Sequence, residues 1–108
     1  MADIIPYLER MRARIEQPAM QPSFQGFART IQLTFPDLQR AFVLSIAQDG
    51  SASLEEKSIP APDITVTTDS DILAGILDRK TNPEVAFITR KLKVSGKMED
   101  LLRLQKLL

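Results

Sequence analysis

The sequence contains no cysteine and no histidine among its 108 residues. The absence of cysteine excludes disulfides and thiol nucleophiles, and the absence of both residues excludes the zinc sites that are built on them. Histidine is also the side chain that most often acts as a general base near neutral pH. Much of enzyme chemistry is therefore excluded, and we expect a protein that is not an enzyme.

Long apolar runs are absent as well. No stretch of about 18 or more apolar residues occurs, so we expect no membrane-spanning segment. The N-terminal stretch MADIIPYLERMRARI carries too many charges for a signal peptide. We therefore expect a cytoplasmic protein. The length fits a single domain, residues 1–108, in which folding buries roughly two-thirds of the unfolded surface.

Charge of one sign is not in excess, because 14 basic residues balance 14 acidic ones. This balance argues against a dedicated nucleic-acid binder. The distribution along the chain is uneven: six basic and two acidic residues follow from Arg90 onward, whereas residues 17–89 contain five basic and nine acidic ones. The basic C-terminal region predicts either a solvated helix face or a surface that contacts an anionic membrane.

Apolar and polar residues alternate in five segments, which is the pattern of strands with one buried face. These segments are 28–35, 40–48, 51–56, 64–67 and 91–95. Asp49-Gly50, between the second and third segments, is typical of a hairpin turn. Strands that are apolar on one face favour an antiparallel sheet with one side covered and the other in water.

Helical spacing of apolar residues marks the remaining segments, apart from a proline- and glutamine-rich connector over residues 17–26. The first helix begins after Asp3, the second after Thr68 or Asp69, and a short third one after Asn82, each with a capping residue. A fourth runs from Lys97 to the C-terminus. The order of elements predicts an α/β (α+β) fold, with one five-stranded sheet and helices packed on one face.

Catalytic and metal-binding patterns are missing. The serines have no histidine to activate them. The acidic residues Asp63, Asp69 and Asp71 lack the spacing of a cation-binding loop. We predict no catalytic residue, no metal site and no cofactor. The many apolar residues of the last third fit either a filled core or the lining of a cavity, and the pattern leaves both open.

The segment from residue 62 to residue 108 resembles the C-terminal half of the sterol carrier protein type two family of non-specific lipid-transfer domains. The family pattern Lys-x-Asn-Pro-x-x-Ala-Phe, then Lys-Leu-Lys-Ile/Val-x-Gly-x-Met, precedes a leucine-rich helix. In this sequence the matching residues are Lys80, Asn82, Pro83, Ala86, Phe87, Lys91, Leu92, Lys93, Val94, Gly96 and Met98. Weaker similarity extends over nearly the whole chain, including the Asp49-Gly50 hairpin.

This resemblance implies a mostly antiparallel five-stranded sheet with helices over one face and a hydrophobic tunnel between the two layers. It also implies a non-catalytic lipid-binding or lipid-transfer protein whose ligand is a fatty acid, fatty acyl-CoA, phospholipid, isoprenoid or sterol-like molecule. By position, the expected ligand-binding residues are Leu33, Phe42, Leu44, Ile72, Ile76, Leu77, Phe87, Met98, Leu101 and Leu102.

Three residues depart from the family pattern toward positive charge. Arg79 and Arg90 replace glycines that are common in the family, and Lys97 replaces a small acidic or amide residue. We expect these side chains at the tunnel rim, where they weaken the helix caps and serve lipid head groups or a transient contact with anionic membrane. The alternative function is a non-catalytic accessory or scaffold protein with a filled tunnel, which forms a homodimer or docks on a partner enzyme of lipid or quinone metabolism.

Overall fold

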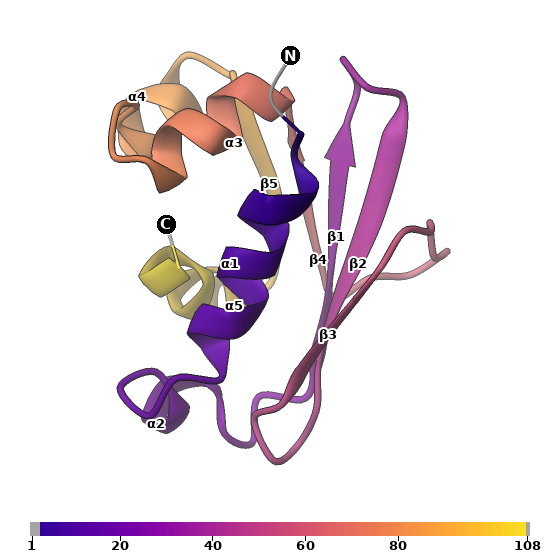
Figure 1. The fold of residues 1–108 in the computed structure, drawn as a ribbon, viewed down its shortest axis with the longest axis vertical. Helices are drawn as coiled ribbons and strands as arrows, with labels where there is room; N and C mark the ends of the chain where they lie inside the picture. Colours follow the sequence, from indigo (N-terminus) through magenta and orange to yellow (C-terminus); the bar gives the residue numbers. More distant parts are fainter. Residues whose placement is uncertain (1–2, 108) are drawn as a thin grey trace.

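The computed structural model describes residues 3–107. Five strands form one sheet, and the helices lie together on one of its faces (Figure 1), as the sequence predicts. The strands are β1 (Arg29–Phe35), β2 (Arg40–Ile46), β3 (Ala52–Glu55), β4 (Ile64–Thr68) and β5 (Leu92–Gly96). The helices are α1 (Ile5–Ile15), α2 (Gln21–Phe24), α3 (Ser70–Leu77), α4 (Pro83–Ile88), α5 (Met98–Leu104) and the 3₁₀ turn η1 (Gln105–Leu107).

The strand order is β3-β2-β1-β4-β5. Neighbouring strands are antiparallel except for β1 and β4, which run parallel with Ile31 opposite Ile64. The connection from β3 to β4 therefore has to pass β2 and β1 to reach its place. It does so on the face away from the helices, where the Ile59 N–H donates a hydrogen bond to Gln32 Oε1 at 2.9 Å.

The alternation of residue types determines which face of the sheet is covered. Ile31, Leu33 and Phe35 of β1 are all buried, while the residues between them are only half-buried. In β2 the same rule places Phe42 inside, but Val43 on the opposite face is buried as well. Its burial is consistent with the β3–β4 connection, which covers part of that face.

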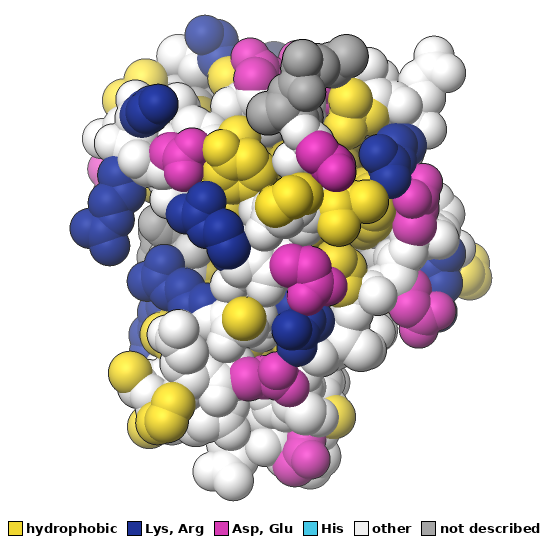
Figure 2. Space-filling model, viewed as in Figure 1, with side chains coloured by type: hydrophobic (Ala, Val, Ile, Leu, Met, Phe, Trp, Pro, Cys, Tyr) yellow, Lys and Arg dark blue, Asp and Glu magenta, His cyan; other side chains and the backbone are white. Residues whose placement is uncertain are grey.

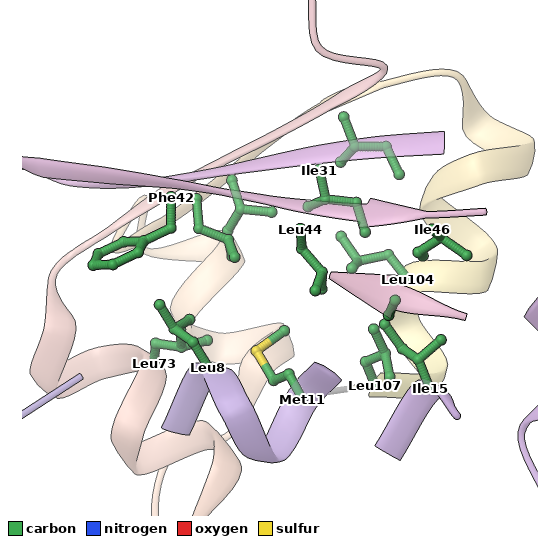
Figure 3. Packing of buried hydrophobic residues seen from close by; sticks show 14 of the residues in the cluster. Leu8, Met11, Ile15, Ile31, Phe42, Leu44, Ile46, Leu73, Leu104 and Leu107 are labelled. Carbon is green, nitrogen blue, oxygen red and sulfur yellow. The ribbon is translucent and has the colours of Figure 1, made fainter. Parts of the chain in front are cut away.

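The centre of the space between helices and sheet is filled with side chains. Leu8, Met11 and Ile15 project from α1 toward the sheet, as Figure 3 shows, and all three are buried. They meet residues of the sheet such as Leu44, which has no exposed surface. Apolar burial of this kind contributes about 1.5–3 kcal/mol for each large side chain.

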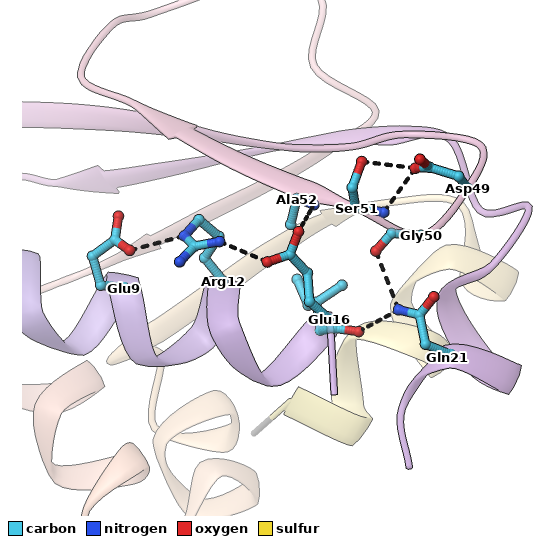
Figure 4. A network of polar contacts seen from close by, with 9 residues as sticks. Glu9, Arg12, Glu16, Gln21, Asp49, Gly50, Ser51 and Ala52 are labelled. Carbon is cyan, nitrogen blue, oxygen red and sulfur yellow. Dashed lines mark hydrogen bonds and ion pairs between the residues drawn. The ribbon is translucent and has the colours of Figure 1, made fainter. Parts of the chain in front are cut away.

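The connector over residues 17–26 is more ordered than predicted, because it contains the short helix α2. Phe24 at its end is completely buried and makes an edge-to-face contact with Phe27. Gln21 holds the segment in place by donating from Nε2 to the carbonyl oxygens of Ile15 at 2.9 Å and Gly50 at 3.3 Å (Figure 4). Two prolines and three glutamines predict a connector, but buried Phe24 and the hydrogen bonds of Gln21 dock it against the rest of the fold.

A polar network joins α1 to the edge strand β3 (Figure 4). Arg12 donates to Glu9 Oε2 at 2.8 Å and to Glu16 Oε1 at 2.7 Å. The second oxygen of Glu16 accepts a hydrogen bond from the Ala52 N–H at 3.1 Å. The N–H of an edge strand is thereby satisfied by a helix side chain, which keeps this end of β3 from pairing with another chain.

One of the three predicted caps forms as expected, because Asn82 Oδ1 accepts from the Glu84 N–H at 2.8 Å. Asp3 Oδ1 accepts from the Ile5 N–H at 3.1 Å, but the cap position of α1 is taken by Ile4, which follows Asp3 and makes no side-chain capping bond. Helix α3 differs, because the side chain of Asp69 makes no capping bond. Asp37, from the β1–β2 turn, accepts from both the N–H and the hydroxyl of Ser70 instead.

Both α3 and α4 end in a left-handed residue. Arg79 has φ of 60° and Arg90 has φ of 62°. The following N–H groups, from Lys80 and Lys91, donate back to Gly75 O at 2.8 Å and Ala86 O at 2.9 Å, which is the Schellman arrangement. Glycine is the usual residue at such a position, so the two arginines hold a conformation that disfavours them.

The C-terminal helix predicted from Lys97 onward is two pieces. Helix α5 ends at Leu104 and continues as the 3₁₀ turn η1. Leu104 and Leu107 are buried against α1 and the sheet (Figure 3). Leu108 lies outside the described residues.

Candidate functional site

An apolar groove of about 690 Å³ lies between α4 and α5, with β5 as its floor. Its size falls within the range of small-molecule sites, roughly 300–1,000 Å³. The lining side chains come from three neighbouring segments of the chain. They are Pro83, Glu84, Phe87 and Ile88 from α4, Leu92 and Val94 from β5, and Met98, Leu101, Leu102, Leu104 and Gln105 from α5 and η1.

Local sequence explains why these side chains face the groove. In β5, Leu92 and Val94 are two residues apart and so point to the same side of the strand. Helix α4 is only six residues long and buries Ala86 against the rest of the protein. Burial of this one small side chain leaves Phe87 and Ile88 to border the groove.

The groove has an apolar outer edge. The large apolar side chains that stay exposed in residues 3–107 lie on α4 and α5, apart from Ile5 of α1 at 37% exposure. They are Val85 (55%), Phe87 (57%), Ile88 (76%), Met98 (70%) and Leu102 (55%). Scattered exposed apolar residues are ordinary, but a cluster on two adjacent helices beside an apolar groove is typical of a binding site.

Four of the ten predicted ligand-binding residues line this groove: Phe87, Met98, Leu101 and Leu102. The other six do not line it, although their contact with ligand remains a prediction. Leu33, Phe42, Leu44 and Ile76 are buried in the core, and Ile72 and Leu77 pack against it. The structure thus brings together the predicted ligand-binding residues of the last quarter of the chain. The predicted residues of the sheet lie apart from them, in the core that α1 covers.

Several lining residues were not predicted from the sequence. Leu92 and Val94 could have been found, because their period-two spacing already places them on one face of a strand that follows α4. Ile88 could also have been found, since it adjoins Phe87 in the same short helix. Nothing in the sequence signals that Leu104, a core residue, also reaches the groove.

The three predicted rim residues occupy different places. Lys97 is the residue that precedes α5 and is exposed. Arg90 lines a second, polar pocket of about 450 Å³, together with Lys91 and Lys93. Arg79 follows α3 and lines neither pocket. Figure 2 shows Lys and Arg side chains gathered along the left-hand edge of the molecule, next to α4 and the C-terminal helix.

The carboxyl groups with shifted pKa values lie away from the groove. Hydrogen bonds from Tyr7 and then Arg10 lower the pKa of Asp78 at the end of α3. Arg40 lowers the pKa of Glu56 by donating to its carboxylate. Both groups are tied into ion pairs or hydrogen bonds that join segments of the fold, and neither faces the groove. This arrangement favours a structural role for them.

Within residues 3–107, no group of three or more acidic side chains is placed to hold a metal ion. No helix in the same range is long and apolar enough to cross a bilayer. The groove can therefore offer apolar contact and, through Glu84 and Gln105, two polar side chains.

Solved structures share this fold. The sterol carrier protein domain 2 of Helicoverpa armigera has a TM-score of 0.79 and 19% identity, over 96% of this chain and 84% of that one. The ubiquinone synthesis protein UbiJ-SCP2 has a TM-score of 0.74 and 12% identity, over 96% and 90% of the two chains. The sec-alkylsulfatase Pisa1 from Pseudomonas sp. has a TM-score of 0.74 and 20% identity over 94% of this chain, but the match spans only 15% of the sulfatase.

No curated protein matches the sequence significantly. The family model of the SCP-2 sterol transfer family matches residues 8–108. Its match covers every strand and the C-terminal helices that form the groove. The family supports lipid binding or transfer as the general class of function. The chain therefore belongs to the SCP-2 sterol transfer family.

Proposed function

We propose that residues 1–108 act as one lipid-binding domain that is not an enzyme and that carries or presents a hydrophobic ligand. The observation that carries this proposal is the apolar groove of about 690 Å³ over β5. Phe87, Met98, Leu101 and Leu102 contact the apolar part of the ligand, and Ile88, Leu92 and Val94 join them. Fatty acid, fatty acyl-CoA, phospholipid, isoprenoid and sterol-like molecules are the candidate ligands.

The open space that would hold the ligand lies at the edge of the sheet and not at its centre. Family resemblance implies a tunnel between helices and sheet, but the middle of that space is occupied by Leu8, Met11 and Ile15 of α1. The open space is displaced toward the edge strand β5.

Native mass spectrometry of the purified protein, combined with thermal unfolding in the presence of palmitate, palmitoyl-CoA, cholesterol and a short isoprenoid quinone, tests the proposal. A ligand that binds only the folded protein, and that is present at a free concentration of about 100 times its Kd, stabilises the protein by about 2.7 kcal/mol. We expect palmitate or the quinone to raise the Tm. Absence of any co-purified lipid, together with no Tm change for the whole panel, would contradict lipid binding.

A groove variant and a matched control make this test specific. Leu102→Trp places a bulky indole in the groove at a half-exposed position, and Ile5→Trp makes a comparable change on α1 outside the groove. We expect Leu102→Trp to reduce the ligand-induced Tm increase and Ile5→Trp to preserve it. Equal behaviour of the two variants would place the ligand elsewhere.

The second candidate function is an accessory or scaffold protein, and the filled centre of the fold favours it. Its partner would be an enzyme of lipid or quinone metabolism, a class suggested by the similarity in fold to a ubiquinone synthesis protein. Under this proposal the exposed side chains of α4 and α5 contact a protein and no lipid enters the groove. The accessory function would be favoured over lipid binding if no lipid of the panel changed the Tm and if the Leu102→Asp variant lost an enzyme that copurifies with the parent protein.

A further inference from the structure

The second pocket, of about 450 Å³, lies where α3 begins and where α4 joins β5. Its size also falls within the range of small-molecule sites. The lining comes from three parts of the chain that meet at one end of the sheet. They are Pro36 after β1, then Thr67, Thr68, Asp69, Asp71 and Ile72 at the junction of β4 with α3, and Arg90, Lys91 and Lys93 at the junction of α4 with β5. We call it the polar pocket.

Strand alternation separates the polar pocket from the groove. Leu92 and Val94 of β5 line the groove. Because side chains alternate along a strand, Lys91 and Lys93 point to the other side and line the polar pocket instead. Lys93 is paired with Thr67 of β4, which lies beside it on the same side of the sheet. The two sites share no lining residue, so a ligand of the polar pocket is independent of the lipid proposed for the groove.

Charged groups of both signs line the polar pocket without pairing. The β4–α3 junction supplies two acidic side chains and the α4–β5 junction supplies three basic ones, which leaves a net charge of +1. Within residues 3–107, none of these five side chains takes part in an ion pair. Asp69 also makes no capping bond to α3. Both charges therefore remain available to a ligand that carries the two opposite charges itself.

Buried hydrogen bonds fix the backbone on both sides of the polar pocket. Ser70, between the two acidic residues, is 6% exposed, and its N–H and hydroxyl donate to Asp37 at 3.0 and 2.6 Å. Thr68 is 3% exposed, and its hydroxyl donates to Lys91 O at 2.8 Å. Arg90 is held in its left-handed conformation at the end of α4. The charged side chains thus project from fixed positions, which lowers the cost of ordering the site when a ligand binds.

We propose that the polar pocket binds a small phosphate monoester that carries an ammonium group. Arg90, Lys91 and Lys93 contact the phosphate oxygens, since basic side chains form strong charge-assisted hydrogen bonds with phosphate. Asp69 and Asp71 contact the ammonium group. A phosphate monoester carries a charge of about −1.5 to −2 at pH 7, so with one ammonium group the net charge is close to −1. The ligand therefore balances the charge of the pocket.

Ligands with a single charged group fit the polar pocket less well. Inorganic phosphate would be attracted by the basic side chains but repelled by the two carboxylates, and a simple amine would meet the reverse. A phosphate diester with an ammonium group, as in a phosphatidylethanolamine head group, has no net charge and gains less from a pocket of net charge +1. The combination of three basic and two acidic side chains favours the monoester.

NMR titration of the ¹⁵N-labelled protein at physiological ionic strength tests the proposal. The probes are O-phosphoethanolamine, inorganic phosphate, ethanolamine and glycerophosphoethanolamine, the last of which represents a lipid head group. Amide signals of Thr68 and Asp71 report on the polar pocket, and those of Val94 and Leu101 report on the groove. We expect O-phosphoethanolamine to cause saturable shifts at the polar pocket. Phosphate and ethanolamine should bind about tenfold more weakly, because each loses the contacts of one charge, and glycerophosphoethanolamine should also bind more weakly.

Charge variants with matched controls locate the two ends of the ligand. Lys93→Gln and Asp71→Asn each remove one charge from the polar pocket. Lys97→Gln and Glu99→Gln remove the same charges at exposed positions that line neither site. We expect both pocket variants to weaken O-phosphoethanolamine binding by about three- to fivefold, and the controls to change it by less than about twofold. Inorganic phosphate should bind more tightly to Asp71→Asn and more weakly to Lys93→Gln.

Several results would overturn the proposal. One is the absence of saturable shifts at the polar pocket, and another is tighter binding of O-phosphoethanolamine to Asp71→Asn, because the ammonium group would then have no part in recognition. Equal losses in the pocket variants and the controls would show that net charge alone is responsible. Equal or tighter binding of glycerophosphoethanolamine would reject the monoester. Leu102→Trp, which changes the groove, should leave these titrations unchanged, so the two sites are judged separately.

Discussion

Replacement of Arg79 and Arg90 by glycine should stabilise the protein. Both arginines have φ near 60°, a conformation that costs an L-residue about 1–2 kcal/mol. Glycine adopts it without that cost but loses about 0.5–1 kcal/mol more conformational entropy on folding. The difference leaves a net gain of about 0.5–1 kcal/mol at each site. For a domain of this size that gain corresponds to about 2–4 °C in Tm per site.

Thermal and urea unfolding of Arg79→Gly, Arg90→Gly and the double variant measure this gain. Alanine at each site is the matched control, since it removes the guanidinium group but keeps the Cβ that causes the strain. The alanine variants should stay within about 0.5 kcal/mol of the parent. Glycine variants that lose stability, or alanine variants that gain as much as glycine, would refute the reasoning from φ.

Other parts of the structure give three further predictions. Arg29→Met leaves Asp100, whose side chain is 6% exposed, without its ion pair, and should cost roughly 1–3 kcal/mol in urea unfolding. Asp78→Asn should make the stability of the protein fall less steeply in acid. Hydrogen bonds from Tyr7 and Arg10 lower the pKa of Asp78 in the folded protein. The stability that they contribute is therefore present above the unfolded pKa of about 3.9 and is lost as the pH falls through the folded pKa. Gly96→Ala should cost roughly 1–3 kcal/mol in thermal unfolding, because φ is 151° and the new Cβ would lie 2.9 Å from the Asp63 carbonyl oxygen. A neutral result for any of the three would contradict the contact named for it.

The elements themselves could be read from the sequence because each depends on local residue order. Period-two alternation correctly assigned the buried face of β1 through Ile31 and Leu33, and Asn82 correctly marked the start of α4. The cap of α3 could not be read in this way, since it comes from Asp37, which is 33 residues away from Ser70. The parallel pairing of β1 with β4 is likewise a long-range property.

The site was harder to predict than the fold. Leu44 and Leu102 are the same residue type in equally regular patterns, yet one is fully buried and the other is 55% exposed beside the groove. The difference arises because α1 covers the middle of the sheet, whereas among residues 3–107 no helix covers the space between α4 and α5. Periodicity indicates which side of an element is apolar, but it does not indicate whether another element fills the space in front of it.

The location of the ligand is the central claim, and two methionines can test it. Met98 borders the groove and is 70% exposed, whereas Met11 lies between α1 and the sheet, where the family resemblance places a tunnel. The measurement is the methionine-methyl NMR spectrum during titration with spin-labelled stearate, which broadens signals close to the label. We predict broadening of the Met98 signal while that of Met11 stays sharp. Broadening of Met11 first would place the ligand beneath α1, and no broadening of either would contradict lipid binding in the groove.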